Sequence, residues 1–504
     1  MRGYLRDAAL MAAATGASRI FGLVRDAAIA SRFGTTAAYD AFVVAFFVPH
    51  LLRRLLAEGA LSTGFIPAYT ASLVESDDAE RLASNVLSLL LLLFPVVVAL
   101  GIWLAPTYVS FLASGFAPEK LKETVALARI LFPFIALMGV SSVLMGILNA
   151  HRRFFLPALA PVLFNVGMIL GATVLAPLFS TRPIAGLAVG ALIGGTGQLL
   201  LQVPAVLRLG IRFRFTLWPV HPGVRRMLRV MAPAVLALAV TQINLLVDNK
   251  LASHLGDGGI SALQYATRLF QLPLGVFAVS VASALLPRIA AAASRRQQQE
   301  LASHVRHGLL ATTFVLLPAA VGLALVSREV IATLFEHGRF AASDTLRTAT
   351  VLMAYTLGIV PYGLTYVLAR AFYGVGRVGY PLVALSLAVA TNIGCDLLFV
   401  GTMREAGLAL ATSLAGIVNA AVLAYGLRRS LRFASEDALQ WGKIALGAGL
   451  LAATVLPVRL SLVASPTPVR LAVCVAVGIA AYTLFSLASG LHRLVIDRGE
   501  DPLA

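Results

Sequence analysis

Residues 16–58 read GASRIFGLVRDAAIASRFGTTAAYDAFVVAFFVPHLLRRLLAE. This stretch has the length and apolar content of two long membrane helices, but charged side chains occur within both. An ionisable residue inside a membrane span is costly, so it normally faces protein or a water-filled cavity and marks a functional site. Several basic residues here therefore predict a site for an anion. The charged residues that we single out are Arg19, Arg25, Asp26, Arg53, Arg54 and Glu58.

The composition of the whole chain is that of a membrane protein. Of its 504 residues, 59% are hydrophobic and 12% are charged, against about 25% charged in a typical soluble domain. In lipid every backbone polar group must be bonded within its own helix. We therefore predict an all-α polytopic membrane protein and exclude a soluble multidomain one.

Apolar runs of about 20 residues predict fourteen transmembrane helices. These runs lie near residues 8–33, 38–70, 84–112, 123–150, 157–180, 185–207, 227–255, 259–288, 306–327, 346–373, 380–401, 406–427, 442–461 and 469–491. Pro49 and Pro273 interrupt the second and the eighth run, which favours kinked helices over straight ones.

The basic residues indicate how the chain is oriented. A formal net charge of +17 would suggest nucleic-acid binding in a soluble protein. Here most arginines lie in every second link between spans, as the positive-inside rule describes for cytoplasmic loops. The alternate links GTTAAY, STRP and GDGG are nearly uncharged, although the 72–83 link is acidic. We predict that both termini are cytoplasmic, and we expect no nucleic-acid partner.

The chain repeats itself at an offset of about 222–224 residues. VRDAAIASRFG (24–34) aligns with LVDNKLASHLG (246–256), and GILNAHRRFFLP (146–157) aligns with ARAFYGVGRVGYP (369–381). The offset covers six predicted spans, an even number, so the two halves share one orientation. Parallel repeats of this kind are typical of transporters that hold the substrate between halves and alternate access by rocking.

The repeat divides the chain into three parts. We predict a first six-helix lobe over residues 1–222 and a second over residues 223–430. Residues 431–504 contain the last two spans and lie outside the repeat.

The first candidate site is the arginine cluster. Arg19 and Asp26 share one helix face, while Arg25 shares a face with Ser18 and the small Gly22. Arginine offers a planar fork of donors that matches phosphate, and it stays charged at any depth. The alternative is that these arginines snorkel to the membrane surface or form structural pairs.

Three further arginines differ in their expected roles. Arg54 and Glu58 are four residues apart, which predicts an ion pair within one helix. Arg53 points to another face. In the second half, Arg268 precedes Pro273 and has no carboxylate nearby in its own helix. We expect Arg53 and Arg268 to face the anion site.

A second constellation consists of oxygen-bearing side chains. Asn392 and Asp396 are one helical turn apart and present oxygens on one face, with Asp248 and Thr412 on other predicted spans. Hard oxygen ligands suit a small cation such as sodium. The alternative is a structural polar contact between helices.

Several motifs are excluded or have ordinary explanations. GVGRVG (374–379) matches a nucleotide-binding pattern, but no βαβ unit surrounds it, so we predict a turn between spans. Cys395 and Cys474 lie in apolar runs and are interpreted as buried thiols without a disulfide. His221 lies in a predicted link and is interpreted as solvated. No GxxxxGKS/T, HExxH or Ser/His/Asp arrangement supports an enzyme or a required cofactor.

Several segments resemble the MurJ (MviN) lipid II flippases of bacteria. They are SRIFGLVRDAAIASRFG, YDAFVVAFFVPHLLRRLLAEGALSTGFIP, GILNAHRRFFLPALAPVLFN, ATRLFQLPLGVFAV and LFEHGRFAASD. The resemblance extends over essentially the whole chain and also covers the 369–398 segment. This family belongs to the superfamily of multidrug and oligosaccharidyl-lipid exporters.

The resemblance implies a function and a set of sites. It implies a monomeric transporter of the bacterial cytoplasmic (inner) membrane that moves the undecaprenyl-diphosphate-linked peptidoglycan precursor lipid II to the outer leaflet. It places Arg19, Arg25, Asp26, Arg53 and Arg268 on central-cavity positions, with Ser18 and Glu58 as neighbours or gate residues. It also implies a sodium site at Asp248, Asn392, Asp396 and Thr412 with the Leu408 carbonyl, and a lipid-tail groove in the last two spans.

Other functions stay open. A flippase for another prenyl-linked oligosaccharide, such as an O-antigen or capsule unit, would share this architecture. A cation-coupled multidrug antiporter should prefer acidic cavity residues, whereas this predicted cavity is basic. A membrane glycosyltransferase would need a catalytic acid and large outer loops, and the predicted outer loops are mostly short.

Overall fold

A computed structural model describes residues 2–55, 62–75, 78–218, 220–295, 297–428 and 435–496. Within these ranges the regular structure is helical, without β-strands, as the sequence predicts. The chain forms two compact units. Unit 1 is Met1–Ser261 with His337–Phe340, and unit 2 is Ala262–Glu336 with Ala341–Ala504.

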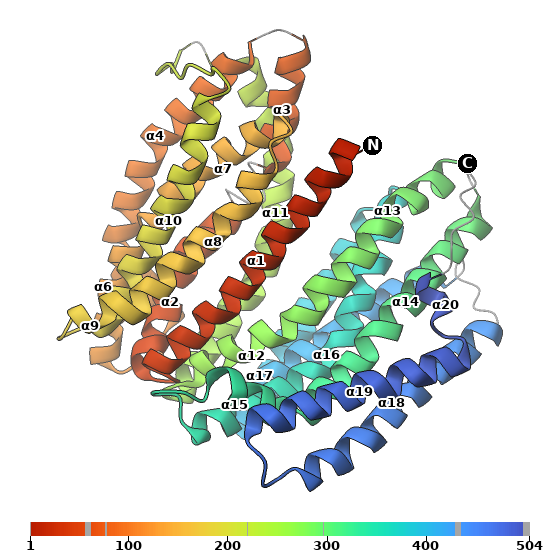
Figure 1. The fold of residues 1–504 in the computed structure, drawn as a ribbon. Coiled ribbons are helices and arrows are strands. Elements are labelled where there is room, and N and C mark those ends of the chain that lie inside the picture. Colours follow the sequence, from red (N-terminus) through yellow and green to blue (C-terminus); the bar gives the residue numbers. More distant parts are fainter. Residues whose placement is uncertain are drawn as a thin grey trace. The chain divides into compact units, whose positions relative to one another are not determined.

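Unit 1 contains the helices up to the first turn of α12 (Figure 1). Their bounds are α1 (Arg2–Phe33), α2 (Ala37–Leu52), α3 (Ser62–Glu75), α4 (Ala79–Trp103), α5 (Ala105–Leu112), α6 (Pro118–Leu131), α7 (Phe134–Ala150), α8 (Phe155–Leu170), α9 (Ala176–Leu178), α10 (Pro183–Leu207), α11 (Pro222–Ala252) and α12 (Gly259–Pro273). Phe65, Tyr69, Val143 and Ile147 are central to a buried core that α3 and α7 form with α4.

Unit 2 contains the remaining helices (Figure 1). They are α13 (Val279–Ser294), α14 (Gln298–Leu325), α15 (Ser327–Phe335), α16 (Ala342–Gly374), α17 (Gly379–Leu427), α18 (Ser435–Ser461), α19 (Thr467–Ser489) and α20 (Arg493–Ile496). The Tyr482 hydroxyl on α19 donates to the Phe314 carbonyl at 2.7 Å, which ties the C-terminal helices to α14. Cys474 is buried in this region, as predicted, whereas Cys395 is half-buried.

Ten helical segments of the described chain are long and apolar enough to cross a membrane. They are Ala79–Trp103, Pro118–Ala150, Phe155–Leu178, Pro183–Leu207, Gly259–Ser294, Gln298–Leu325, Ala342–Gly374, Gly379–Leu427, Asp437–Ser461 and Thr467–Ser489. The segment Gly379–Leu427, which is helix α17, covers two predicted spans. Its backbone leaves the helical region at Arg404, with φ 52° and ψ −130°, between the predicted spans 380–401 and 406–427. The count of fourteen stays a prediction.

Both prolines that interrupt predicted spans are followed by wider helical turns. Residues 53–55 wind as a π-helix shortly after Pro49, and Leu274–Ala278 do so directly after Pro273. Proline lacks the N–H that a regular helix would use, and local π turns are one of the adjustments by which membrane helices tolerate proline. The two copies of the repeat therefore share a distortion at the position where the sequence predicts one.

The repeat also appears in the backbone angles. Gly34 (φ 59°) and Gly256 (φ 80°) end the aligned segments 24–34 and 246–256. Arg152 (φ 58°) and Gly376 (φ 73°) occupy matching positions in the two aligned links. Positive φ angles are uncommon outside glycine, so their recurrence at the repeat offset indicates that both copies change direction at matching positions. The helix ends differ, since α1 continues to Phe33 while a 3₁₀ turn, Ser253–Leu255, precedes Gly256.

Candidate functional site

Arg25 and Asp26 form an ion pair on α1. The Arg25 side chain donates to Asp26 Oδ1 from Nε at 2.9 Å and from Nη2 at 2.7 Å. The two side chains are only 12% and 8% exposed. Since an unpaired buried charge is costly, Asp26 stabilises the guanidinium inside an apolar helix bundle.

A third residue, Asn165 on α8, completes this cluster. Its Oδ1 accepts a hydrogen bond from Arg25 Nη1 at 2.8 Å, and its Nδ2 donates to the Ser18 carbonyl at 3.1 Å. A Cβ at Gly22 would lie 3.8 Å from Asn165 Nδ2, an ordinary van der Waals distance, so the amide packs directly against this part of α1. Asn165 therefore orients Arg25 from a second helix.

Glycines bring α8 close to its neighbour α10. A Cβ at Gly190 on α10 would lie 2.6 Å from the Gly167 carbonyl oxygen on α8, and one at Gly194 would lie 2.7 Å from the Phe164 carbonyl oxygen. Small residues allow membrane helices to approach this closely. The contact fixes α8 in unit 1, and with it the position of Asn165.

The other predicted anion-site residues are more dispersed. Arg19 is exposed on α1, and Arg53 is half-buried in the π-turn after α2. Arg268 is half-buried on the part of α12 that belongs to unit 2. Arg54 is exposed, while Glu58, its predicted partner, lies outside the described residues. Convergence of these arginines on one cavity stays a prediction.

The predicted cation ligands occur in both units. In unit 2, Asn392 and Asp396 are fully buried, and Asn392 Nδ2 donates to Asp396 Oδ2. The Thr412 hydroxyl donates to the Leu408 carbonyl at 3.0 Å. Asp248 belongs to unit 1, where Asn244 Nδ2 lies 3.4 Å from Asp248 Oδ2. Carboxylate, amide, hydroxyl and carbonyl oxygens such as these are the kind of ligand that a sodium ion prefers.

A buried network around Asp40 was not predicted. Asp40 is 0% exposed and accepts hydrogen bonds from Lys120 Nζ at 2.9 Å and from the backbone N–H groups of Gly258 and Ser261 at 2.7 and 2.8 Å. Lys120 also contacts Asp257 Oδ1 at 2.9 Å. The carboxylate thus satisfies N–H groups at the start of α12, where a helix favours negative charge. The sequence did contain a sign of this network, because Asp40 is the one charged residue in the apolar run YDAFVV (39–44).

Unit 2 has its own buried ion pairs. Glu329 on α15 is 2% exposed and lies 2.7 Å from Arg459 Nε and 3.7 Å from Arg470 Nη1. Arg347 on α16 pairs with Glu405 on α17. These pairs join helices that are distant in sequence, so we assign them a structural role.

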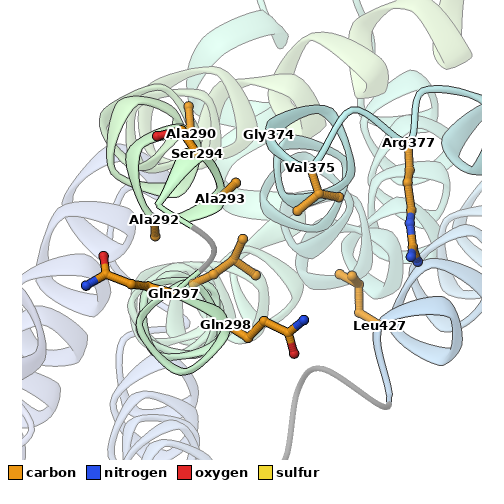
Figure 2. A pocket seen from close by; sticks show the side chains of 11 residues that line it. Ala290, Ala292, Ala293, Ser294, Gln297, Gln298, Gly374, Val375, Arg377 and Leu427 are labelled. Atoms are coloured by element: carbon orange, nitrogen blue, oxygen red, sulfur yellow. The ribbon is translucent and has the colours of Figure 1, made fainter.

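The GVGRVG segment is a turn at the edge of a pocket. Helix α16 ends at Gly374 and α17 begins at Gly379, as predicted. Figure 2 shows Gly374, Val375 and Arg377 beside the ends of α13 and α14, around a pocket of about 470 Å³. Alanines, two glutamines and Leu427 complete most of its lining.

One histidine was interpreted wrongly. His221 is 7% exposed, and its Nδ1 accepts the Gly223 N–H at 3.0 Å while Nε2 lies 3.2 Å from Asp78 Oδ2. It is the N-cap of α11 and is not a solvated loop residue. Helix ends require such partners for their free N–H groups, which the sequence pattern did not reveal.

Comparison with known proteins identifies the family. The family model described as "Lipid II flippase MurJ" matches residues 29–477. A lipid II flippase MurJ from Burkholderia cenocepacia is 34% identical over 421 residues, which cover 82% of this chain and 81% of that protein. The chain belongs to the MurJ family. A Vibrio cholerae protein named "Probable lipid II flippase MurJ" is 31% identical over 508 residues, covering 97% of this chain and 96% of that protein.

Solved structures agree with membership of the MurJ family. A structure described as "Lipid II flippase MurJ, inward closed conformation" has a TM-score of 0.82 and 29% identity, covering 96% of this chain and 99% of that chain. A multidrug resistance MATE family transporter of the MOP superfamily has a TM-score of 0.70 at 20% identity, covering 82% of this chain and 94% of that chain. The second match shows a shared fold only.

Proposed function

We propose that the chain is a flippase that moves lipid II from the inner to the outer leaflet of the bacterial cytoplasmic membrane. Membership of the MurJ family over residues 29–477 carries this proposal. MurJ proteins are transporters, so we expect no catalysis by this chain.

The proposed architecture has fourteen spans and alternating access. Two six-helix lobes (1–222 and 223–430) would rock about a central cavity, and residues 431–504 would form a groove for the lipid tail. Recurring left-handed residues and proline-linked π-turns at the repeat offset support two copies of one design. Both termini would be cytoplasmic, and the protein would act as a monomer.

The headgroup needs a charged and hydrated route, because a diphosphate, sugars and a peptide cannot cross hydrocarbon unaided. Arg19, Arg25, Arg53 and Arg268 would hold the diphosphate. Asp26 and Asn165 support this role for Arg25, since they hold its guanidinium in a partly buried position. The membrane potential assists export, because each negative charge moved outward gains about 2.3 kcal/mol per 100 mV.

A sodium ion would act at a separate site. Asp248, Asn392, Asp396 and Thr412 with the Leu408 carbonyl would hold it, and the full burial of Asn392 and Asp396 supports this assignment. The sodium ion would bind one conformation of the protein more tightly than the other. This difference in affinity would shift the equilibrium between the two conformations.

The test is complementation in cells depleted of their own lipid II flippase. We expect the chain to restore growth and the appearance of lipid II at the outer surface, measured by its accessibility to an added degrading enzyme. Arg53→Ala and Arg268→Ala should abolish both, while Arg288→Ala, at an exposed arginine of unit 2, serves as the control. Rescue only of an O-antigen flippase deletion would reassign the substrate, and normal growth of either arginine variant would remove its assigned role.

A further inference from the structure

The link between α10 and α11 is a strap pinned along α4. The N–H groups of Arg212, Arg214 and Thr216 donate to Glu80 Oε1, Ser84 Oγ and Ser88 Oγ at 3.4, 3.2 and 2.9 Å. Two extended residues span about 6.6 Å and one helical turn about 5.4 Å, so alternate strap residues meet successive turns of α4. The strap is therefore a built element of unit 1.

The pinned strap presents aromatic and basic side chains. Phe215 and Trp218 are 66% and 83% exposed, and Phe213 is 37% exposed. Arg212 and Arg214 alternate with the phenylalanines and are exposed as well. The strap follows α10, a candidate membrane span that ends at Leu207. Tryptophan beside arginine at the end of a span is typical of the lipid headgroup region.

Three arginines line a recess directly after the strap. Arg225, Arg226 and Arg229 on α11 form it with Val220 and Pro222, and its volume is about 390 Å³. In the part of the chain that the structure describes, none of these three arginines has an ion-pair partner. No acidic residue lies in the first turn of α11.

This placement is electrostatically unfavourable for the helix alone. Cations near a helix N-terminus oppose the helix dipole, and three arginines within two turns also repel one another. The positive-inside rule requires only that a cytoplasmic loop contain basic residues. It does not explain why these residues lie in a recess beside a strap that is hydrogen-bonded to α4. A bound anion would relieve both penalties.

We propose that this recess binds the phosphate of an acidic membrane phospholipid, while Phe213, Phe215 and Trp218 lie among the neighbouring acyl chains and headgroups. Arginine forks match phosphate oxygens bidentately, and the exposed aromatic strap supplies the membrane contact that a soluble phosphate would lack. The site is separate from the arginine cluster of α1 and does not depend on the proposed substrate.

Tryptophan quenching tests the proposal in the full chain. With Trp103→Phe and Trp441→Phe, Trp218 is the remaining tryptophan of the three. The protein is reconstituted in vesicles of one fixed mixture of acidic and zwitterionic phospholipid, and the bromine label is carried by either lipid in turn. We expect stronger quenching when the acidic lipid is brominated, which means enrichment at Trp218 at constant surface charge.

Variants identify the groups responsible. R225Q/R226Q/R229Q should lose the preference, by about fivefold for each arginine removed. R288Q/R295Q/R428Q, which removes three exposed arginines of unit 2, should keep it. If the triple variant does not remain monodisperse, Arg229→Gln alone should still show about a fivefold loss.

Several results would overturn the proposal. They are equal quenching by both brominated lipids, an unchanged preference in the triple variant, or an equal loss in the unit 2 control. Inorganic phosphate is added in a last arm at constant ionic strength. Retained preference supports the lipid, and its abolition would assign the recess to a soluble anion.

Discussion

The two copies of the repeat share a backbone but differ in their polar groups. Segments 24–34 and 246–256 both end at a glycine with a left-handed φ. In the first copy Arg25 pairs with Asp26 and contacts Asn165. At the matching positions the second copy has Val247 and Val389, so both members of the Arg25–Asn165 contact are replaced by valine.

The second copy has a polar pair of its own. Asn392 and Asp396 are fully buried, and the first copy has Met168 and Ala172 at the matching positions. The Arg25–Asn165 contact is thus lost at both positions, whereas Asp26 keeps a counterpart in Asp248. A buried polar group needs a partner, and in the second copy Asn244 Nδ2 lies 3.4 Å from Asp248 Oδ2.

Breaking the Arg25–Asp26 ion pair of the first copy should have the largest effect on growth and stability. Arg25→Val removes the cation that Asp26 contacts at 2.7 Å, and loss of one member of a buried pair typically costs about 3–5 kcal/mol. We expect no growth of flippase-depleted cells that express this variant and a lower thermal stability of the purified protein. Val247→Ala in the second copy is the control and should support growth. Normal growth of the Arg25 variant would contradict the role proposed for the first copy.

The second copy is tested with sodium. At constant ionic strength, replacing potassium by sodium should raise the unfolding temperature of the purified chain, because an ion that binds only the folded state adds about 2.7 kcal/mol at a hundred times its Kd. Asp396→Ala should abolish this response, whereas Glu119→Ala, an exposed carboxylate in unit 1, should keep it. A sodium response that survives in Asp396→Ala would place the ion elsewhere.

A smaller effect is expected from replacing Asn165, the uncharged partner of Arg25. Asn165→Val leaves Arg25 with Asp26 but removes the acceptor of Nη1, at a cost of about 1–3 kcal/mol. Its thermal stability should fall, and the loss should be smaller when Arg25→Val is already present, because residues in one network are not additive. Val389→Ala measures the background at the matching position. Strict additivity of the two first-copy changes would mean that the contact contributes nothing.

The glycines that end both segments should show the smallest difference. Alanine is strained at either glycine because both have a positive φ, and Gly256, with ψ −170°, lies in a region that is essentially restricted to glycine, at a cost of about 1–3 kcal/mol. A Cβ at Gly34 would also lie 2.7 Å from the Arg339 carbonyl oxygen, whereas Gly256 has open space. Gly34→Ala should therefore lower the unfolding temperature more than Gly256→Ala. Equal losses would show that the 337–340 segment adapts freely.

Local features of the site were predictable, and distant partners were not. The apolar run around Arg25 and Asp26 indicated that charged residues lie inside a membrane span, although helix faces grouped Asp26 with Arg19, and the structure pairs it with Arg25. Asn165 lies 140 residues from Arg25 in the chain, and Lys120 lies 80 residues from Asp40. No periodicity in the sequence relates them. The predicted Arg54–Glu58 ion pair is also local in sequence. It stays a prediction, because Glu58 lies outside the described residues.

The sequence by itself determined the helical class, the recurring turns and the prolines that distort two spans. Each of these depends on apolar length, on proline or on glycine, which act through the backbone near the residue itself. Only the tertiary structure decided which polar groups meet: Asn165 with Arg25, Asp40 with the start of α12, and the strap with α4. Those contacts depend on how helices pack against one another, and packing is set by many side chains at once.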